Sequence, residues 1–149
     1  MRFAEYLNPR LVVFLEAATQ EGAIDELIEK LDQERKIPHR KSFRSAILQR
    51  EQIVSTGIGM GVAIPHAKIS TLPDFFIVIG IQRTKGIEWN ALDKAPVRLV
   101  FLIGGPDNRQ SEYLQILSQL TTAIRNIDLR KELLKARTPQ DAVALFETA

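Results

Sequence analysis

The chain has 149 residues, of which 45% are hydrophobic and 26% charged, with 20 Lys and Arg against 18 Asp and Glu. This length suits one globular domain, and the net charge of +2 is too balanced to indicate nucleic acid or an acidic membrane as partner. Absence of cysteine excludes disulfides, thiol catalysis and zinc–thiolate sites. No apolar run approaches the roughly 20 residues of a transmembrane helix, and the N-terminus lacks the apolar core of a signal peptide. We therefore expect one cytoplasmic domain over residues 1–149, which reaches a membrane only indirectly through a transporter.

The first part of the chain predicts a strand followed by two helices. Residues 1–10 predict a loosely attached lead-in, and the apolar, β-favouring run 11–15 predicts a first strand. Apolar residues at helical spacing predict an amphipathic helix over about 20–35. Ser42 can cap a second helix that runs to about Glu51.

The remainder of the chain interleaves strands and helices. Four segments have the composition of strands: 62–64, 75–81, 86–89 and 97–103. Three helices are expected after residue 108: one with an inner stripe of Leu114, Leu117, Leu120, Thr121 and Ile124, one over about 129–136, and one capped by Thr138 with Pro139 first. This order predicts an α/β domain, a sheet covered by helices on both faces.

The most unusual stretch is residues 56–66, Thr-Gly-Ile-Gly-Met-Gly-Val-Ala-Ile-Pro-His. Alternating Gly57, Gly59 and Gly61 suggest a loop whose N–H groups can turn toward an anion, although a tight turn without ligand is the alternative. Pro65 cannot continue a ladder of hydrogen bonds, so the preceding strand should end there and leave His66 at a strand terminus. We hypothesise that His66 is a nucleophile that carries a phosphoryl group.

A neutral imidazole can attack phosphorus without a separate base, because one of its nitrogens has a free lone pair. The site must then neutralise the phosphoryl oxygens. Arg50 can supply a guanidinium, Thr56 a hydroxyl, and residues 57–61 their backbone N–H groups. No metal is required for this chemistry, and the two histidines and scattered carboxylates have no metal-ligand spacing. The stretch is neither a nucleotide P-loop nor a dinucleotide fingerprint.

Arg50-Glu51 together with residues 55–66 closely resembles the signature of the enzyme IIA domains of the bacterial phosphotransferase system. The branch that it resembles is the fructose/mannitol type, which includes the stand-alone nitrogen-regulatory (PtsN-like) proteins. The resemblance runs from about Leu11 to the C-terminal helix. It implies a single α/β domain with a mixed sheet flanked by helices. We expect no cofactor. It also implies that a histidine-containing phosphocarrier protein phosphorylates His66, which makes the chain a stoichiometric phosphohistidine intermediate.

The resemblance leaves two functions open. In sugar-transporting members the phosphoryl group passes on to a IIB partner, whereas in regulatory members phosphorylation switches the binding of other target proteins. The sequence identifies neither a sugar nor a partner. A hydrolytic enzyme fits poorly, because no acid–base pair or nucleophile triad can be assembled from the spacings.

One position departs from the family pattern. Mannitol- and nitrogen-type members carry a second histidine near the active one, whereas this chain reads Glu112-Tyr113-Leu114 there. Tyr113 can donate a hydrogen bond to a phosphoryl oxygen, but it cannot become cationic as histidine can. Stabilisation of a phosphorylated His66 would then depend more heavily on Arg50.

Each candidate residue also has a structural interpretation. His66 can be a hydrogen-bonded structural histidine, Arg50 a solvated cation at a helix end, and Thr56 a turn cap. Tyr113 can be a helix-packing residue with a hydrated hydroxyl. Met60 can belong to a partner-docking surface or lie buried under the loop.

Overall fold

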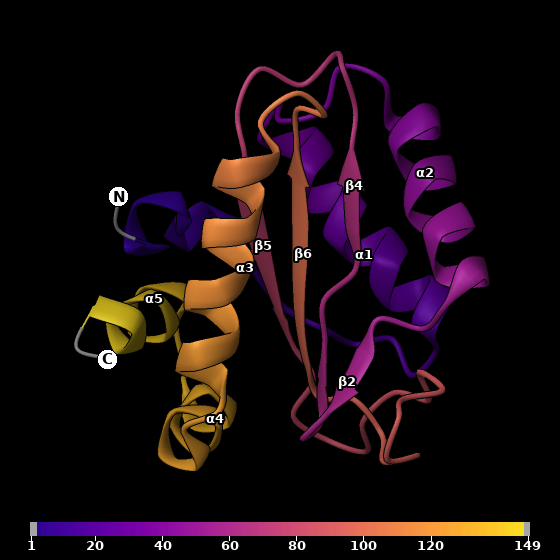
Figure 1. The fold of residues 1–149 in the computed structure, drawn as a ribbon. Coiled ribbons are helices and arrows are strands. Elements are labelled where there is room, and N and C mark those ends of the chain that lie inside the picture. The colour runs from indigo at the N-terminus through magenta and orange to yellow at the C-terminus, as the bar shows by residue number, and fades with distance from the viewer. Residues whose placement is uncertain (1–2, 148–149) are drawn as a thin grey trace.

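The computed structural model describes residues 3–147, and these form a mixed six-stranded sheet with helices on both faces (Figure 1). The strands are β1 (Val12–Phe14), β2 (Gly57–Gly59), β3 (Val62–Ala63), β4 (His66–Lys68), β5 (Phe76–Ile81) and β6 (Leu99–Gly105). The helices are α1 (Gln20–Gln33), α2 (Arg40–Ile53), α3 (Gln110–Ile124), α4 (Ile127–Lys135) and α5 (Pro139–Glu147), with short 3-10 helices η1 (Phe3–Tyr6) and η2 (Pro9–Leu11) before β1. The predicted fold class, an α/β domain with a mixed sheet between helices, is confirmed.

The sheet has the order β1-β5-β6-β3-β2, and β4 also pairs with β6. β5 and β6 are antiparallel, whereas β1 is parallel to β5, and β3 and β4 are parallel to β6. Between β3 and β4 the Pro65 carbonyl accepts a hydrogen bond from the Ile103 amide. Proline has no N–H to donate, so it interrupts the strand, as predicted. The pairing resumes at His66, which therefore begins a strand of its own.

The two central strands are buried along their whole length, which accounts for their continuous apolar sequences. Helices α1 and α2 cover one face of the sheet, and α3, α4 and α5 cover the other (Figure 1). The α1–α2 layer contributes Ile24, Leu27, Ile28, Phe43 and Ile47. The opposite layer contributes Ile116, Leu120, Ile124, Leu133 and Phe146. The predicted cap of α5 is present, since Thr138 Oγ1 accepts from the Asp141 amide at 3.1 Å.

Residues 86–89 were predicted as a strand, and this is wrong. Their pairing is confined to isolated bridges that include Ile87 with Val97. The buried Gln82 side chain accepts hydrogen bonds from the Thr84 and Gly86 amides, so these groups fold the chain into a turn. Gly86 has a φ of +83°, which belongs to a turn and not to a strand.

Two helix predictions also need correction. Helix α2 begins at Arg40, with His39 at the cap position, so Ser42 lies inside the helix and does not cap it. In α3 the predicted inner residue Leu114 is 51% exposed. Tyr113 and Ile116 point inward in its place, because the buried stripe recurs at helical spacing from Tyr113.

The predicted loose attachment of residues 1–10 is wrong for residues 3–10, and residues 1–2 lie outside the described part. Phe3 and Leu7 are buried in the α3–α5 layer, and the Phe3 ring lies 5.6 Å from the ring of Phe146. The Phe3 amide also donates to Gln119 of α3 at 2.8 Å. An aromatic side chain of this size stabilises the fold when it is buried, so this segment belongs to the domain core.

Candidate functional site

A partly buried hydrogen-bond network holds the connection between α2 and β2 in place. Glu51 accepts hydrogen bonds from the Thr56 hydroxyl, from the Thr56 amide at 3.2 Å and from Gln20 Nε2 at 3.0 Å. Trp89 Nε1, from a different part of the chain, donates to the same hydroxyl at 3.2 Å. A hydroxyl has one proton to donate, and in Thr56 it is given to the Glu51 carboxylate. Thr56 therefore has no proton left for a phosphoryl oxygen, and its observed role is to position the α2–β2 turn.

The glycine-rich stretch forms a β-hairpin of β2 and β3 and not an open loop. Met60 and Gly61 at its tip have φ values of 61° and 73°, the positive values that tight hairpin turns require. The Met60 amide donates to the Asp93 carboxylate at 3.2 Å, and the Gly57 amide donates to Ser55 Oγ at 3.1 Å. These glycines thus serve chain geometry, and the two amides are already bonded within the protein.

Strand register separates the hairpin tip from His66. The Gly61 carbonyl accepts from the Leu99 amide, whereas His66 is paired with Ile103. This shift along β6 corresponds to about 13 Å at the usual rise of a strand. Gly61, and with it Gly59 beyond the turn, lies too far away for its amide to hold a phosphoryl group on His66. The phosphate-binding role predicted for these two glycines is not supported.

His66 is half-buried at the start of β4. Its Nδ1 lies 3.2 Å from the carbonyl oxygen of Ile64. Because a carbonyl oxygen can only accept, the neutral ring carries its proton on Nδ1 and leaves the lone pair of Nε2 free. This tautomer is the one in which Nε2 can act as a nucleophile.

The surroundings of His66 keep its ring neutral. Burial lowers the pKa of His66 below its ordinary value of 6.5, and the positive charges of Arg50 and Lys68 lower it further, while the hydrogen bond to Ile64 acts in the opposite direction. Arg50 lies in the last turn of α2, where its Nη1 is 3.4 Å from the Val54 carbonyl oxygen. Its charge thus acts on His66 from the neighbouring helix.

Tyr113 of α3 lies beside the His66 ring. It is buried in α3, and its ring centroid lies 5.6 Å from that of His66 and 6.2 Å from that of Phe75. Burial raises the pKa of Tyr113, against the opposing charge of Arg50, so the phenol remains protonated near neutral pH. Tyr113 is therefore both a packing residue and a neutral hydrogen-bond donor beside the imidazole.

Three of the predicted site residues, His66, Arg50 and Tyr113, are thus brought together. Lys68 was missed, although a signal for it was present. Side chains two residues apart on a strand share a face, so a strand that began at His66 would have placed Lys68 beside it. The prediction ended the strand at Pro65 and so did not use this alternation.

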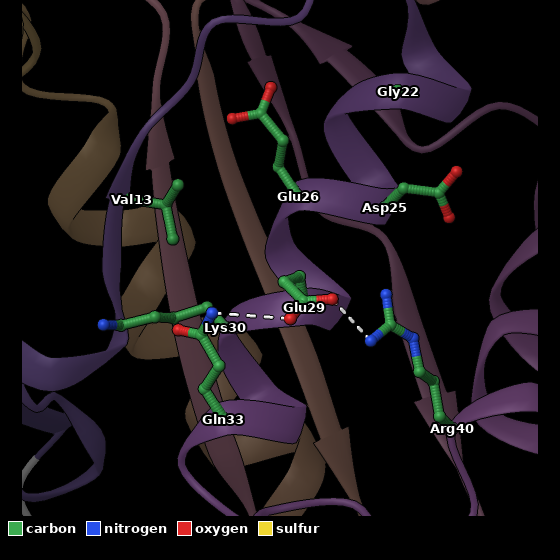
Figure 2. Close-up of a pocket in the computed structure, with 8 residues that line it drawn as sticks. All are labelled: Val13, Gly22, Asp25, Glu26, Glu29, Lys30, Gln33 and Arg40. Carbon is green, nitrogen blue, oxygen red and sulfur yellow. Dashed lines mark hydrogen bonds and ion pairs between the residues drawn. The ribbon is translucent and has the colours of Figure 1, made fainter.

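A separate groove of about 430 Å³ lies on α1, in the helical layer opposite to α3 (Figure 2). Its acidic side chains are already paired within the protein. The pairs are Asp25 with Arg44, Glu29 with Arg40 and Gln33, and Glu26 with the amides of Glu16 and Ala17. Because its lining includes neither His66 nor Arg50 nor Tyr113, the groove is not part of the candidate site.

Within residues 3–147 no three His, Asp or Glu side chains gather in a way that could hold a metal ion. No helix in the same range combines the length and the apolar character needed to cross a membrane.

Fold and site together define an α/β domain in which the imidazole of His66 begins a strand and is acted on by the guanidinium of Arg50. The family model described as "Phosphoenolpyruvate-dependent sugar phosphotransferase system, EIIA 2" matches residues 5–149. The chain belongs to this family, which confirms the resemblance drawn from the motif.

Relatives and solved structures are found in both the fructose and the nitrogen branches. The chain is 35% identical over 144 residues to a fructose-specific EIIABC component of Bacillus subtilis, covering 96% of this chain but 22% of that protein. It is 34% identical over 143 residues to a fructose-specific EIIA component of Haloferax volcanii, covering 93% of this chain and 92% of that protein. The structure of the nitrogen regulatory protein IIA-Ntr from Neisseria meningitidis matches with a TM-score of 0.88 at 25% identity, covering 96% of this chain and 97% of that one.

The fold also recurs in a complex. The structure of enzyme IIA-mannitol with phosphorylated enzyme IIB-mannitol from Escherichia coli matches with a TM-score of 0.80 at 21% identity, covering 96% of this chain and 98% of that one. At 21% identity this match shows that the two proteins share a fold.

Proposed function

We propose that this protein is a phosphohistidine carrier of the phosphoenolpyruvate-dependent phosphotransferase system, acting in the cytoplasm, and that His66 Nε2 is its acceptor atom. The observation that carries the proposal is the hydrogen bond between His66 Nδ1 and the Ile64 carbonyl, since it leaves the Nε2 lone pair free. Membership of the EIIA family supports the phosphoryl chemistry.

In the proposed transfer, the Nε2 lone pair forms a bond to phosphorus as the bond between phosphorus and the donor imidazole breaks. The bonding electrons stay with the donor ring, which becomes neutral. The proton of His66 stays on Nδ1 throughout, hydrogen-bonded to the Ile64 carbonyl, so the step needs no general base. That hydrogen bond then stabilises the positive charge that the phosphorylated ring acquires.

Two groups would stabilise the transferred phosphoryl oxygens. Arg50 supplies a guanidinium that already acts electrostatically on His66, and a guanidinium can bind phosphate through two parallel hydrogen bonds. The Tyr113 phenol supplies a neutral donor from α3. Thr56 and Gly57 are proposed to act indirectly, by holding the backbone between α2 and β2.

The proposed donor is a histidine-containing phosphocarrier protein, and the proposed acceptor is a IIB partner. The IIB partner is suggested by the mannitol complex of the same fold. Two exposed apolar side chains lie three and four residues after Arg50: Ile53 is 80% exposed and Val54 is 53% exposed. They are suited to contact such partners.

A second candidate function is a regulatory module whose binding of target proteins is switched by phosphorylation of His66. The TM-score of 0.88 to a nitrogen regulatory IIA protein favours it. Pull-downs with the phosphorylated protein and with His66→Ala distinguish the two functions. A target bound by only one of the two forms supports the switch, and identical binding by both contradicts it. Neighbouring genes for IIB and IIC components would instead favour transport.

The test of His66 is phosphorylation by phosphoenolpyruvate, the first enzyme of the system and its phosphocarrier protein. Intact-mass analysis should show one added phosphate on the wild type and none on His66→Ala. His39 is exposed, and His39→Ala is the matched control that should behave like the wild type. A wild type that stays unmodified while a known IIA protein is phosphorylated in the same mixture would refute the proposal.

A further inference from the structure

Lys68 shares a face of β4 with His66, as residues two apart on a strand do. Their backbones are about 6.6 Å apart along the strand. The intervening Ala67 points to the opposite side and is buried in the layer with α1 and α2. Lys68 is half-buried, and its charge acts on the imidazole of His66.

The ammonium group of Lys68 is held in place by two residues of α3. Its Nζ donates to Gln110 Oε1 at 2.6 Å and lies 4.5 Å from the centroid of the Tyr113 ring. That ring is also the neighbour of His66, at 5.6 Å between centroids. An aromatic face attracts a cation through its quadrupole, so Tyr113 holds the lysine close to the imidazole without carrying a charge itself.

We propose that Lys68 donates a hydrogen bond to the phosphoryl group on His66, and that the Tyr113 ring positions it. This inference depends on the proposed function. When the phosphoryl group arrives, Lys68 exchanges its hydrogen bond with Gln110 for one with a phosphoryl oxygen. Lys68 stays protonated throughout, so it neither gives a proton to the reacting groups nor takes one from them.

Charge balance explains why a second cation is useful here. A phosphoryl group brings up to two negative charges to a half-buried site, and Arg50 supplies one positive charge from α2. Lys68 supplies another from β4, on the side where α3 contributes the neutral Tyr113. The ammonium is a compact charge on a flexible stem, so it can move from Gln110 to the phosphoryl group without movement of the backbone.

The experiment measures single-turnover phosphorylation of the whole chain by a phosphorylated phosphocarrier protein. Lys68→Met keeps the length of the side chain without its charge, and we expect transfer to slow about ten- to a hundredfold, as for loss of one hydrogen bond to a charged group. Lys68→Arg should restore the rate to within a few-fold of wild type. Lys131→Met, an exposed lysine on α4, is the matched control and should leave the rate unchanged.

The role of the Tyr113 ring is tested by combining variants. Lys68→Met should slow transfer as much in a Tyr113→Phe background, which keeps the ring, as in the wild type. In a Tyr113→Leu background the effect of Lys68→Met should be smaller, because Lys68 has already lost the aromatic ring that positions it. An equal effect in all three backgrounds would overturn the positioning role.

The outcomes separate the inference from the proposed function. If the wild type is not phosphorylated at His66, the proposed function fails. If the wild type is phosphorylated at His66 and Lys68→Met reacts as fast as Lys131→Met, the inference alone fails. NMR titration of the His66 ring gives a second readout, since removal of the Lys68 charge should raise the pKa of His66.

Discussion

The substitution Thr56→Val distinguishes two roles for the Thr56 hydroxyl: positioning the α2–β2 turn, or direct contact with a phosphoryl group. Valine keeps the volume of threonine but removes the hydroxyl that donates to Glu51 and accepts from Trp89 Nε1. Trp89 is 1% exposed, so its N–H would be left buried without a partner. An orphaned donor costs about 1–3 kcal/mol, and loss of a hydrogen bond to a charged group costs a similar amount. Since Glu51 keeps its bonds to the Thr56 amide and Gln20, we expect a total of about 3 kcal/mol.

Urea denaturation followed by tryptophan fluorescence measures this loss, and Trp89 is the chain's single tryptophan. A loss of this size corresponds to a fall in Tm of about 6–12 °C for a domain of this length. Thr56→Ser is the control, because it retains the hydroxyl and should stay within about 1 kcal/mol of wild type. A Thr56→Val protein as stable as Thr56→Ser would refute the network. A stable variant that failed in phosphoryl transfer would instead show that the hydroxyl contacts the phosphoryl group.

Two further predictions concern pH and the register of α3. Burial, together with the charges of Arg50 and Lys68, lowers the pKa of His66, so the neutral nucleophile persists below pH 6.5. When the single-turnover rate is measured against pH, its fall on the acid side should have a midpoint below 6.5. A midpoint at or above 6.5 would contradict a buried His66 beside two positive charges. Because the pKa of His66 is lower in the folded than in the unfolded chain, the unfolded chain binds this proton at a higher pH. The contribution of His66 to the free energy of unfolding is therefore present above pH 6.5 and lost as the pH falls through the folded-state pKa. Urea unfolding at several pH values measures this loss. In α3, Ile116→Ala should lower the free energy of unfolding by about 2–5 kcal/mol because Ile116 is fully buried. Leu114→Ala should change it by less than about 1 kcal/mol. Equal losses in chemical denaturation would mean that Ile116 does not face the core in preference to Leu114.

Several features of the protein follow from the sequence alone, because they depend on local patterns. Continuous apolar runs predicted β5 and β6, helical spacing predicted α1, and Thr138 with Pro139 predicted the start of α5. The motif that ends in His66 was sufficient to recognise the family, since its combination of residue types is specific.

Only the tertiary structure decided which groups around His66 are free to act. Thr56 was a reasonable phosphate ligand by residue type, yet a tryptophan 33 positions away and a glutamate occupy its hydroxyl. Gly61 was close to His66 in sequence, but strand register along β6 separates them. Lys68 shares a face of β4 with His66 by local alternation, but its contacts with Tyr113 and Gln110 exist only because α3 packs beside β4. A residue's chemistry is a local property that sequence reveals, whereas its available donors and its distance from a partner depend on contacts between distant segments.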